Sequence, residues 1–514
     1  MNVADHLAAA ALRAPEALAI HVVATGEAIT FGELDRQTTA VALGLTKIGI
    51  QPDERILVMV RPGIEIITLT YALFRMGALP VLIDPGMGRA AFLACVASMK
   101  PTGLIGIPLA HVARFLFPST FRSVKHAITV GTRWFWGGPT FAQLRSTPGA
   151  FTRVEMDSES PAAILFTSGS TGPAKGVLYT HGIFDAQVHA LRETYGFEAG
   201  EIDVAAFPLF SLFDNALGMT SIIPDIDASK PASARPEKIA DAITRFHATT
   251  AFGSPVIWRK AAPWFLANSL VFPELRRIMI AGAPISPGLL ETLLTALPNG
   301  DVGTPYGATE ALPVACVWGR EILAETAEQT RAGAGTCVGR VAFGIDLVII
   351  GIDDGPIPVF DPSLILPDGE VGEICVRGPQ VTRAYVERED ANAAAKMADG
   401  TTTWHRMGDL GYRDPQGRIW FCGRKSERVG GLYTDQVEGV FNGWPGVTRS
   451  ALVGVDGTAI LVVEGAKNTA LATRITDTGR VARVLFHPAF PVDPRHQSKI
   501  HRHTLAAWAK EQAQ

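Results

Sequence analysis

Residues 164–176 read Ile164-Leu165-Phe166-Thr167-Ser168-Gly169-Ser170-Thr171-Gly172-Pro173-Ala174-Lys175-Gly176. An apolar segment typical of a buried strand leads here into a loop of hydroxyl and glycine residues, which a lysine closes. Small residues let backbone N–H groups approach an anion, the hydroxyl groups add donors, and Lys175 can neutralise an outer phosphate. Because Gly176 follows the lysine and the Gly-x4-Gly-Lys spacing is absent, the loop is not of the Walker type. The alternative is a flexible linker, but the strand and the lysine favour phosphate binding.

The segments around this loop alternate between short apolar runs and amphipathic stretches. Thr30 and Glu33 have the spacing of a capping box and predict the start of a helix, after which residues 55–60 read as a buried strand. Residues 277–280 read as another strand, and Ser286 is the expected N-cap of the helix that follows it. Alternation of this kind predicts an α/β fold built on parallel sheets.

The pattern changes after about residue 340. Short strands separated by turns such as residues 367–370 and 414–417 predict an antiparallel or barrel-like subdomain. The 90 residues after Arg424 contain strands and a terminal helix of their own, which is enough for a small separate domain.

The composition limits the classes of function. The chain has 514 residues, 47% of them hydrophobic, and its 46 Lys+Arg against 50 Asp+Glu give a net charge of −4. These values are typical of a globular protein of two or more domains, and the charge balance argues against nucleic acid as the main partner. Five cysteines without a CxxC pair predict free thiols in a reducing cytoplasm, and we expect neither a signal peptide nor a membrane span.

Further short motifs follow one another along the chain. They are residues 72–78, Ala281-Gly282-Ala283-Pro284, Tyr306-Gly307-Ala308-Thr309-Glu310, Gly372-Glu373-Ile374, Met407-Gly408-Asp409-Leu410-Gly411 and Gly423-Arg424-Lys425. With the loop at 167–176, the ordered set resembles the adenylate-forming superfamily of acyl-CoA synthetases, nonribosomal-peptide adenylation domains and luciferases over nearly the whole chain. The resemblance implies a large N-terminal domain of parallel α/β subdomains plus a β-barrel-like subdomain (1–422), which binds nucleotide and acyl chain. It also implies a hinge at 423–425 and a small mobile α+β C-terminal cap at 426–514.

The resemblance implies ATP as substrate, Mg²⁺ as cofactor and a defined set of site residues. Tyr306 offers a flat face for adenine, Glu310 is a hard carboxylate suited to Mg²⁺, and Asp409 can accept hydrogen bonds from ribose. For each the alternative is structural: a buried aromatic ring, a solvated acid and a turn-forming aspartate. The expected nucleotide-binding residues are Thr167, Ser168, Gly169, Ser170, Thr171, Gly172, Lys175, Gly282, Ala283, Pro284, Tyr306, Gly307, Ala308, Thr309, Asp409 and Arg424.

The expected catalytic residues are Lys175, Glu310 and Lys499. Lys499 lies in a segment, residues 491–502, that resembles the family's C-terminal lysine loop, although Ser498 replaces the usual glycine. The implied role of this lysine is to reach the α-phosphate and the substrate carboxylate, where negative charge develops during adenylation. The alternative is a solvated lysine ahead of the last helix.

Three departures from the common pattern narrow the branch. Residues 207–218 lack the histidine that many acyl-CoA synthetases have after the Pro-Leu-Phe turn, Ser426 stands in place of the hinge aspartate, and residues 430–438 lack the familiar asparagine. These departures weaken the case for a second, CoA-dependent half-reaction. With residues 83–88 and 432–438 they resemble the β-lactone synthetases of bacterial long-chain olefin biosynthesis.

That branch activates a long-chain 3-hydroxy fatty acid as its adenylate, and the hydroxyl of the substrate then displaces AMP. It implies possible assembly with a thiolase, a reductase and a β-lactone decarboxylase. Apolar residues between positions 207 and 258 are candidates for an acyl tunnel or for plain core. They are Phe207, Phe210, Phe213, Met219, Phe252 and Trp258. His181 and His247 are assigned no role as base, because a lone histidine is more often a structural group. The alternatives to the lactone reaction are an AMP-forming acyl-CoA ligase and a non-catalytic homologue.

Overall fold

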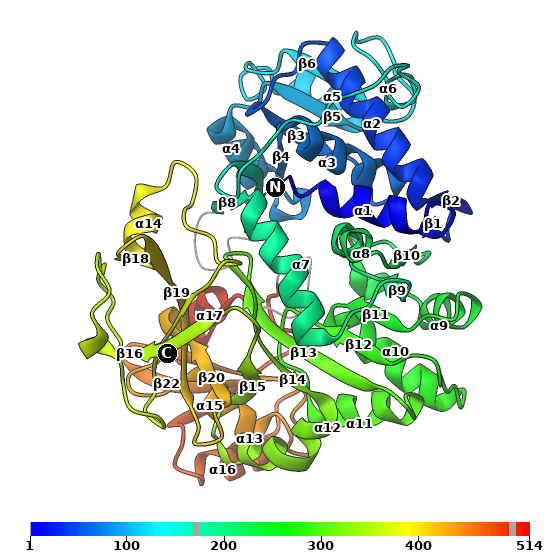
Figure 1. The fold of residues 1–514 in the computed structure, drawn as a ribbon. Helices are drawn as coiled ribbons and strands as arrows, with labels where there is room; N and C mark the ends of the chain where they lie inside the picture. The colour runs from blue at the N-terminus through cyan, green and yellow to red at the C-terminus, as the bar shows by residue number, and fades with distance from the viewer. Residues whose placement is uncertain (1, 168–173, 493–499, 514) are drawn as a thin grey trace.

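The computed structural model describes residues 2–167, 174–492 and 500–513 of the chain (Figure 1). The expected fold class is confirmed: two sheets flanked by helices make up the larger part, and a third, small sheet lies near the C-terminus. No helix among these residues is long and apolar enough to cross a bilayer.

The first sheet has six strands in the order β6-β5-β3-β4-β7-β8, all parallel except for the antiparallel pair β7 and β8. Its strands are β3 (Arg55–Met59), β4 (Leu79–Leu82), β5 (Gly103–Gly106), β6 (His126–Thr129), β7 (Pro161–Phe166) and β8 (Gly176–Thr180). Its helices are α1 (Asp5–Arg13), α2 (Phe31–Lys47), α3 (Ile64–Met76), α4 (Arg89–Met99), α5 (Pro108–Leu116) and α6 (Phe141–Leu144). The side chain of Thr30 caps α2 by accepting from the backbone of Glu33, as predicted.

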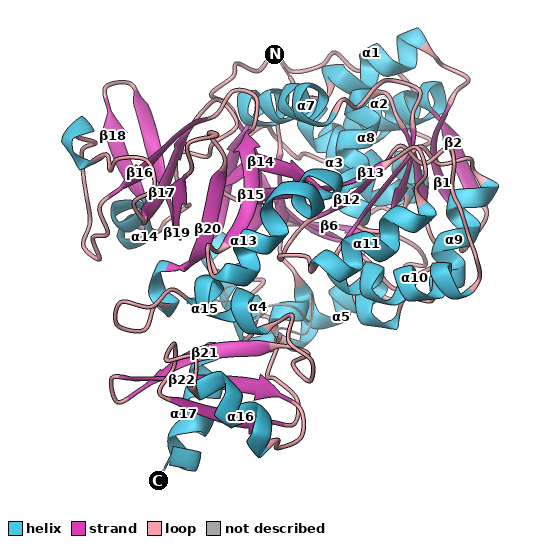
Figure 2. Cartoon of the chain, turned by 90° about the horizontal axis from the view of Figure 1, so that it is seen from below, coloured by secondary structure: helices cyan, strands magenta, loops and turns pink. Residues whose placement is uncertain are grey.

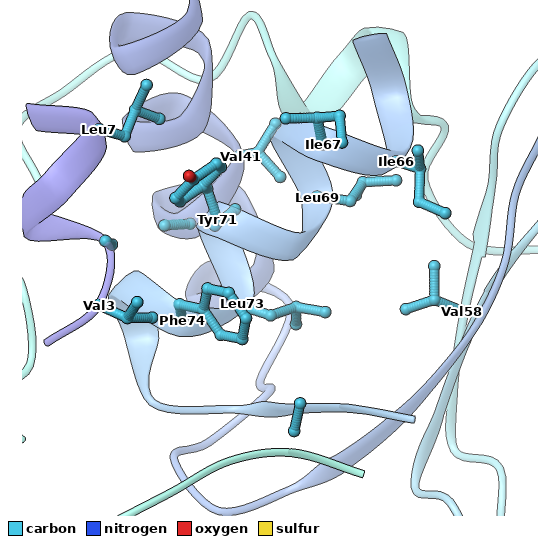
Figure 3. Close-up of a cluster of buried hydrophobic side chains, with 14 of the residues drawn as sticks. Val3, Leu7, Val41, Val58, Ile66, Ile67, Leu69, Tyr71, Leu73 and Phe74 are labelled. Carbon is cyan, nitrogen blue, oxygen red and sulfur yellow. The ribbon is translucent and has the colours of Figure 1, made fainter. Parts of the chain in front are cut away.

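The core beside this sheet is built on α3, whose residues from Ile66 to Met76 are all buried. Figure 3 shows Tyr71 and Phe74 of α3 among the aliphatic side chains of neighbouring elements. The hydroxyl of Tyr71 donates to the carbonyl of Leu212 at 2.7 Å and so ties α3 to the second sheet region. The motif at residues 72–78 is therefore mainly a packing element.

The second sheet has 14 strands, with the main order β16-β17-β19-β20-β15-β14-β13-β12-β11-β9-β10-β1-β2 and β18 paired to β19. The strands β13, β12, β11, β9, β10 and β1 run parallel, and the pairs from β13/β14 to β16/β17 are antiparallel. The strands are β1 (Leu18–Val22), β2 (Glu27–Thr30), β9 (Ile202–Ala205), β10 (Thr220–Ile223), β11 (Thr250–Gly253), β12 (Arg277–Ile280), β13 (Asp301–Ala308), β14 (Ala311–Trp318), β15 (Thr336–Val341), β16 (Asp346–Ile350), β17 (Gly372–Arg377), β18 (Lys396–Asp399), β19 (Thr402–Arg413) and β20 (Ile419–Arg424).

The helices of this region include α11, which Ser286 caps as predicted. They are α7 (His181–Tyr195), α8 (Ser211–Leu217), α9 (Pro236–Arg245), α10 (Pro255–Ala267), α11 (Pro287–Ala296), α12 (Gly319–Glu321), α13 (Ala327–Ala332) and α14 (Glu389–Ala395). The antiparallel part begins at β14 and not near residue 340, because β13 and β14 form a hairpin with Ala308 paired to Ala311. Thr309 and Glu310 occupy its tip.

The C-terminal part carries the small sheet β21 (Ser450–Val455), β22 (Thr458–Glu464) and β23 (Arg483–His487), with helices α15 (Thr434–Phe441), α16 (Thr469–Thr476) and α17 (Arg502–Ala513). Figure 2 shows this sheet set apart from the large one, with α15 between them. Thr336 of β15 donates to Asp435 of α15 at 2.5 Å. β20 ends at Arg424, inside the predicted hinge. The domain boundary at residues 423–425 stays a prediction.

Candidate active site

The ends of the expected phosphate loop are closed by two hydrogen bonds. Phe166 pairs with Gly176 across β7 and β8, the backbone N–H of Thr167 donates to the carbonyl of Lys175 at 3.1 Å, and the N–H of Lys175 donates to Oγ1 of Thr167 at 3.2 Å. The loop therefore joins two antiparallel strands, which agrees with its departure from the Walker pattern. Five predicted residues lie outside the described residues: Ser168, Gly169, Ser170, Thr171 and Gly172.

Tyr385 connects the lysine of this loop to the carboxylate on the β13–β14 hairpin. Its hydroxyl donates to Oε1 of Glu310 at 2.7 Å, and Nζ of Lys175 lies 4.8 Å from the centroid of its ring. Burial, with the Glu310 carboxylate beside it, raises the pKa of Tyr385, so the hydroxyl stays protonated and donates. Lys175 and Glu310, which are distant in sequence, therefore both contact Tyr385.

Lys396 of β18 is a second cation at this tyrosine. Its Nζ lies 5.6 Å from the centroid of the Tyr385 ring and donates to the carbonyl of Thr382. Thr382 in turn donates to the carbonyl of Glu310 from its N–H at 2.8 Å and from Oγ1 at 3.0 Å. Burial lowers the pKa of Lys396 to about 7; the Glu310 carboxylate opposes this shift and Lys175 adds to it.

Sequence reasoning missed Lys396, Tyr385 and Thr382. Two of them bond Glu310: Tyr385 donates to its carboxylate and Thr382 donates to its backbone carbonyl. The one available signal was a single lysine within the small, apolar run of residues 393–398. Such a charge is costly to bury unless it serves nearby groups.

A second cluster surrounds Asp409 of β19, which is 5% exposed. The hydroxyl of Tyr306 donates to its Oδ2 at 2.6 Å, and Nη1 of Arg424 donates to its Oδ1 at 2.6 Å. The Asp409 carboxylate raises the pKa of Arg424, whereas burial and then this carboxylate raise the pKa of Tyr306. Each carboxylate oxygen keeps a second lone pair for a ligand hydroxyl. Whether Tyr306 also stacks on adenine stays a prediction.

Gly282, Ala283 and Pro284 follow β12 at its carboxyl end. Gly282 has φ +107, and nothing lies within 4 Å of a Cβ built there. Because β12 and β13 are parallel neighbours, this segment and the hairpin that bears Glu310 lie beyond adjacent strand ends, where open α/β sheets bind ligands. The chain places Gly307, Ala308 and Thr309 on the same hairpin.

The segment after Arg424 is held by charged side chains. Nζ of Lys425 lies 3.0 Å from Oε2 of Glu373, a residue 1% exposed that also pairs with Arg406. Nη1 of Arg428 donates to Oδ1 of Asp354 at 3.1 Å. Lys499, the third expected catalytic residue, lies outside the described residues.

The two histidines considered above have other surroundings. His181 is buried, its Nδ1 accepts from the N–H of Val3 at 3.1 Å, and burial lowers its pKa to about 4. The neutral ring therefore serves to fix the N-terminal segment. His247 is exposed, and its Nδ1 lies 3.0 Å from Oε2 of Glu274.

Five of the six candidate tunnel residues share one cluster. In it Phe210 and Phe252 stack with ring centroids 4.1 Å apart, while Phe207, Phe213 and Met219 pack around them. The sixth, Trp258, is fully buried in a separate core with residues of α9 and α10, which agrees with the second alternative, plain core. The tunnel role of the other five stays a prediction.

A pair of buried acids behind α8 was not anticipated. Asp203 of β9 and Asp214 of α8 are both fully buried, and Ser221 donates to Oδ2 of Asp214 at 2.7 Å. Burial raises the pKa of Asp203 to about 7, a shift that Asp214 opposes and Glu201 increases. Burial and then the Asp203 carboxylate raise the pKa of Asp214. Asp214 lies on α8, the helix that also carries Phe213, one of the candidates for the acyl tunnel.

Comparison with known proteins gives the family. The family described as AMP-binding enzyme matches residues 7–386. The chain belongs to this family. The olefin β-lactone synthetase of Stenotrophomonas maltophilia is 45% identical over 549 residues, covering 99% of this chain and 98% of the relative. The protein of the same name from Xanthomonas campestris is 43% identical over 550 residues, with coverage of 99% and 98%.

Solved structures support the fold of this AMP-binding enzyme. ATP-bound MatB from Rhodopseudomonas palustris superposes with a TM-score of 0.81 at 20% identity, covering 100% of both chains. The predicted resemblance to adenylate-forming enzymes, and within them to the olefin branch, is confirmed.

Proposed function

We propose that this chain activates a long-chain 3-hydroxy fatty acid with ATP and closes the acyl-adenylate to a β-lactone, releasing AMP and pyrophosphate. The observation that carries the proposal is the 45% identity, over 99% of the chain, to a protein named olefin β-lactone synthetase. The grouping of Lys175, Glu310 and Asp409 with their buried partners supports it.

The residues around Glu310 fit a Mg²⁺ ion that is bound together with phosphates. Tyr385 engages Oε1 of Glu310, and among the described residues no group bonds Oε2, which leaves it for a metal. No set of three metal-ligating side chains occurs in the described part of the chain, so phosphate and water oxygens would complete the coordination. When bound, the ion would neutralise charge on the phosphate oxygens.

In the first half-reaction a carboxylate oxygen of the substrate attacks the α-phosphorus, and the bond from this phosphorus to pyrophosphate breaks. Lys175 binds phosphate oxygens from the end of the loop, and Asp409, oriented by Tyr306 and Arg424, holds the ribose. We assign to Lys499 the charge that develops at the α-phosphate. Lys396, beside Lys175 on Tyr385, adds positive charge at the phosphate end when it is protonated.

In the second half-reaction the 3-hydroxyl oxygen attacks the acyl carbon, and the bond from this carbon to the AMP oxygen breaks. The hydroxyl proton passes to the adenylate phosphate, since no histidine is assigned as base. Confining the acyl chain against the Phe210 and Phe252 cluster brings hydroxyl and carbonyl together, which offsets part of the strain of a four-membered ring.

The alternatives are an AMP-forming acyl-CoA ligase and a non-catalytic homologue. The ligase requires the cap to rotate, whereas Lys425 and Arg428 anchor the segment after Arg424 to Glu373 and Asp354. Ser426, which stands in place of the hinge aspartate of ordinary ligases, favours the lactone reaction. The five buried free thiols support a cytoplasmic site of action, and assembly with a thiolase, a reductase and a β-lactone decarboxylase is part of the proposal.

The experiment incubates the full chain with ATP, Mg²⁺ and a long-chain 3-hydroxy acid, with and without CoA. We expect β-lactone and AMP in equal amounts whether or not CoA is present, and neither product with Lys175→Ala. Acyl-CoA without lactone would identify a ligase. A lack of substrate-dependent pyrophosphate exchange in the folded wild type would identify a non-catalytic homologue.

A further inference from the structure

Five of the eleven exposed large hydrophobic side chains of the described residues lie in two neighbouring segments. Three are on α5 and two in the loop after β6. They are Leu109 (70% exposed), Phe115 (50%), Leu116 (68%), Trp134 (56%) and Phe135 (78%), and we call them the aromatic patch. Such a concentration on one surface calls for an interaction partner, whereas scattered single residues do not.

The aromatic rings of the patch pack on a buried tryptophan, Trp136. Trp136 is 4% exposed, and its Nε1 donates to Oγ1 of Thr129 at 2.9 Å. Its ring centroid lies 5.4 Å from that of Trp134 and 5.2 Å from that of Phe135, and Phe135 lies 5.4 Å from Phe115. The exposed rings are therefore held outward by packing from below.

The surrounding sequence carries charge of one sign only. Residues 85–154 contain no Asp or Glu, in a chain that has 50 of them, and eight Lys or Arg. The eight are Arg89, Lys100, Arg114, Arg122, Lys125, Arg133, Arg145 and Arg153. Among the described residues only Arg153 of this set pairs with a carboxylate.

Two of these cations lie in the segments that carry the patch, and two more lie just before β6. Arg114 lies on α5 with its guanidinium carbon 4.9 Å from the centroid of the Phe115 ring, and Arg133 directly precedes Trp134 in the loop. Arg122 and Lys125 are exposed just before β6, the strand that leads into the loop.

We propose that the aromatic patch docks on the surface of an anionic phospholipid bilayer. Trp and Phe side chains enter the interface between headgroups and acyl chains, while the arginine and lysine side chains of these segments bind the lipid phosphates. Positive charge without any acidic residue in the flanking sequence matches the negative surface of an anionic bilayer. This inference goes beyond the proposed reaction and does not depend on it.

The patch is separate from the candidate active site. β6 is the edge strand of the first sheet, four places from β7, which corresponds to about 19 Å at the usual strand spacing. Figure 1 shows β6, α5 and α6 at the end of the molecule away from the C-terminal sheet. Substitutions in the patch should therefore leave the phosphate loop intact.

The test is sedimentation of the full chain with vesicles of phosphatidylglycerol or of phosphatidylcholine. We expect binding to the anionic vesicles, weakening as salt is raised, and little binding to the zwitterionic ones. The double variant Trp134→Ser/Phe135→Ser should lower the affinity at least about ten-fold. Arg122→Gln and Lys125→Gln should each lower it about five-fold. The matched control is Phe343→Ser, at a phenylalanine that is 58% exposed outside the patch, with no effect expected.

Absence of binding to phosphatidylglycerol vesicles, or equal binding by the double variant, would overturn the proposal. A dimer in lipid-free sedimentation velocity that dissociates in the double variant, while vesicle binding persists, would assign the patch to a second copy instead. If the double variant fails to fold by circular dichroism, the two glutamine variants decide, since unchanged binding in both would equally contradict the proposal.

Discussion

Replacing Lys396 with methionine is expected to change the pH dependence of stability in a defined direction. Methionine keeps the length and apolar character of the side chain but cannot carry charge. The amine of Lys396 lies against the Tyr385 ring, and burial lowers its pKa from 10.5 to about 7. Unfolding releases the amine to water, where it is protonated up to its ordinary pKa.

The sign follows from proton binding. Between about pH 7 and 10.5 the unfolded wild type binds more protons at this site than the folded one, so its free energy of unfolding rises with pH there. Below about pH 7 the full cost of burying the charge is present, on the order of 5 kcal/mol. Near pH 9 the cost is on the order of 2 kcal/mol. The wild type should therefore gain about 3 kcal/mol relative to the variant between about pH 6 and pH 9.

The assay is urea unfolding of wild type and Lys396→Met across this pH range. The variant also loses the hydrogen bond to the Thr382 carbonyl, at about 1–3 kcal/mol, but this cost is the same at each pH and cancels in the slope. Lys510→Met, at an exposed lysine of α17, is the matched control and should show a flat difference. A difference between wild type and Lys396→Met that does not vary with pH would show that the Lys396 amine has the same pKa in the folded and unfolded protein.

Three further predictions concern the acids. Asp409→Asn should slow pyrophosphate exchange at least about 100-fold, because Arg424 and Tyr306 lose their shared anionic acceptor; an unchanged rate in a folded variant would show that Asp409 does not act on the nucleotide. Glu310→Gln should raise the Mg²⁺ concentration required for half-maximal exchange about ten-fold or more, measured by magnesium titration, and an unchanged requirement would place the metal elsewhere. Asp203, with its pKa raised to about 7, takes stability from the wild type as pH rises from about 4 to about 7; Asp203→Asn should flatten that fall in thermal unfolding, and an equal fall in both proteins would contradict the assignment.

The parts of the fold that depend on neighbouring residues were predictable. The caps at Thr30 and Ser286 act on N–H groups three residues away, so their spacing in sequence is also their geometry. The start of the antiparallel region was missed because Thr309 and Glu310 belong to a motif that indicates metal and nucleotide binding, and the same residues also form a hairpin tip.

The candidate site was predictable only where a motif names a residue by its local pattern. Lys175 and Glu310 lie in such motifs, but Tyr385, Thr382 and Lys396, which bring them together, come from a segment with no recognisable pattern. Their roles depend on the burial of an amine and a phenol beside a carboxylate, and burial of single polar atoms is a property of the packed chain and not of its periodicity.

In the proposed reaction the acid is activated as an acyl-adenylate, and its own hydroxyl then expels AMP. Oxygen-isotope tracing tests both steps at once, with ¹⁸O placed in the carboxylate of the 3-hydroxy acid in one sample and in its hydroxyl in another. We expect one carboxylate oxygen to be transferred to AMP for each lactone formed, and the hydroxyl oxygen to be retained in the lactone ring. Unlabelled AMP, or loss of the hydroxyl label from the ring, would contradict it.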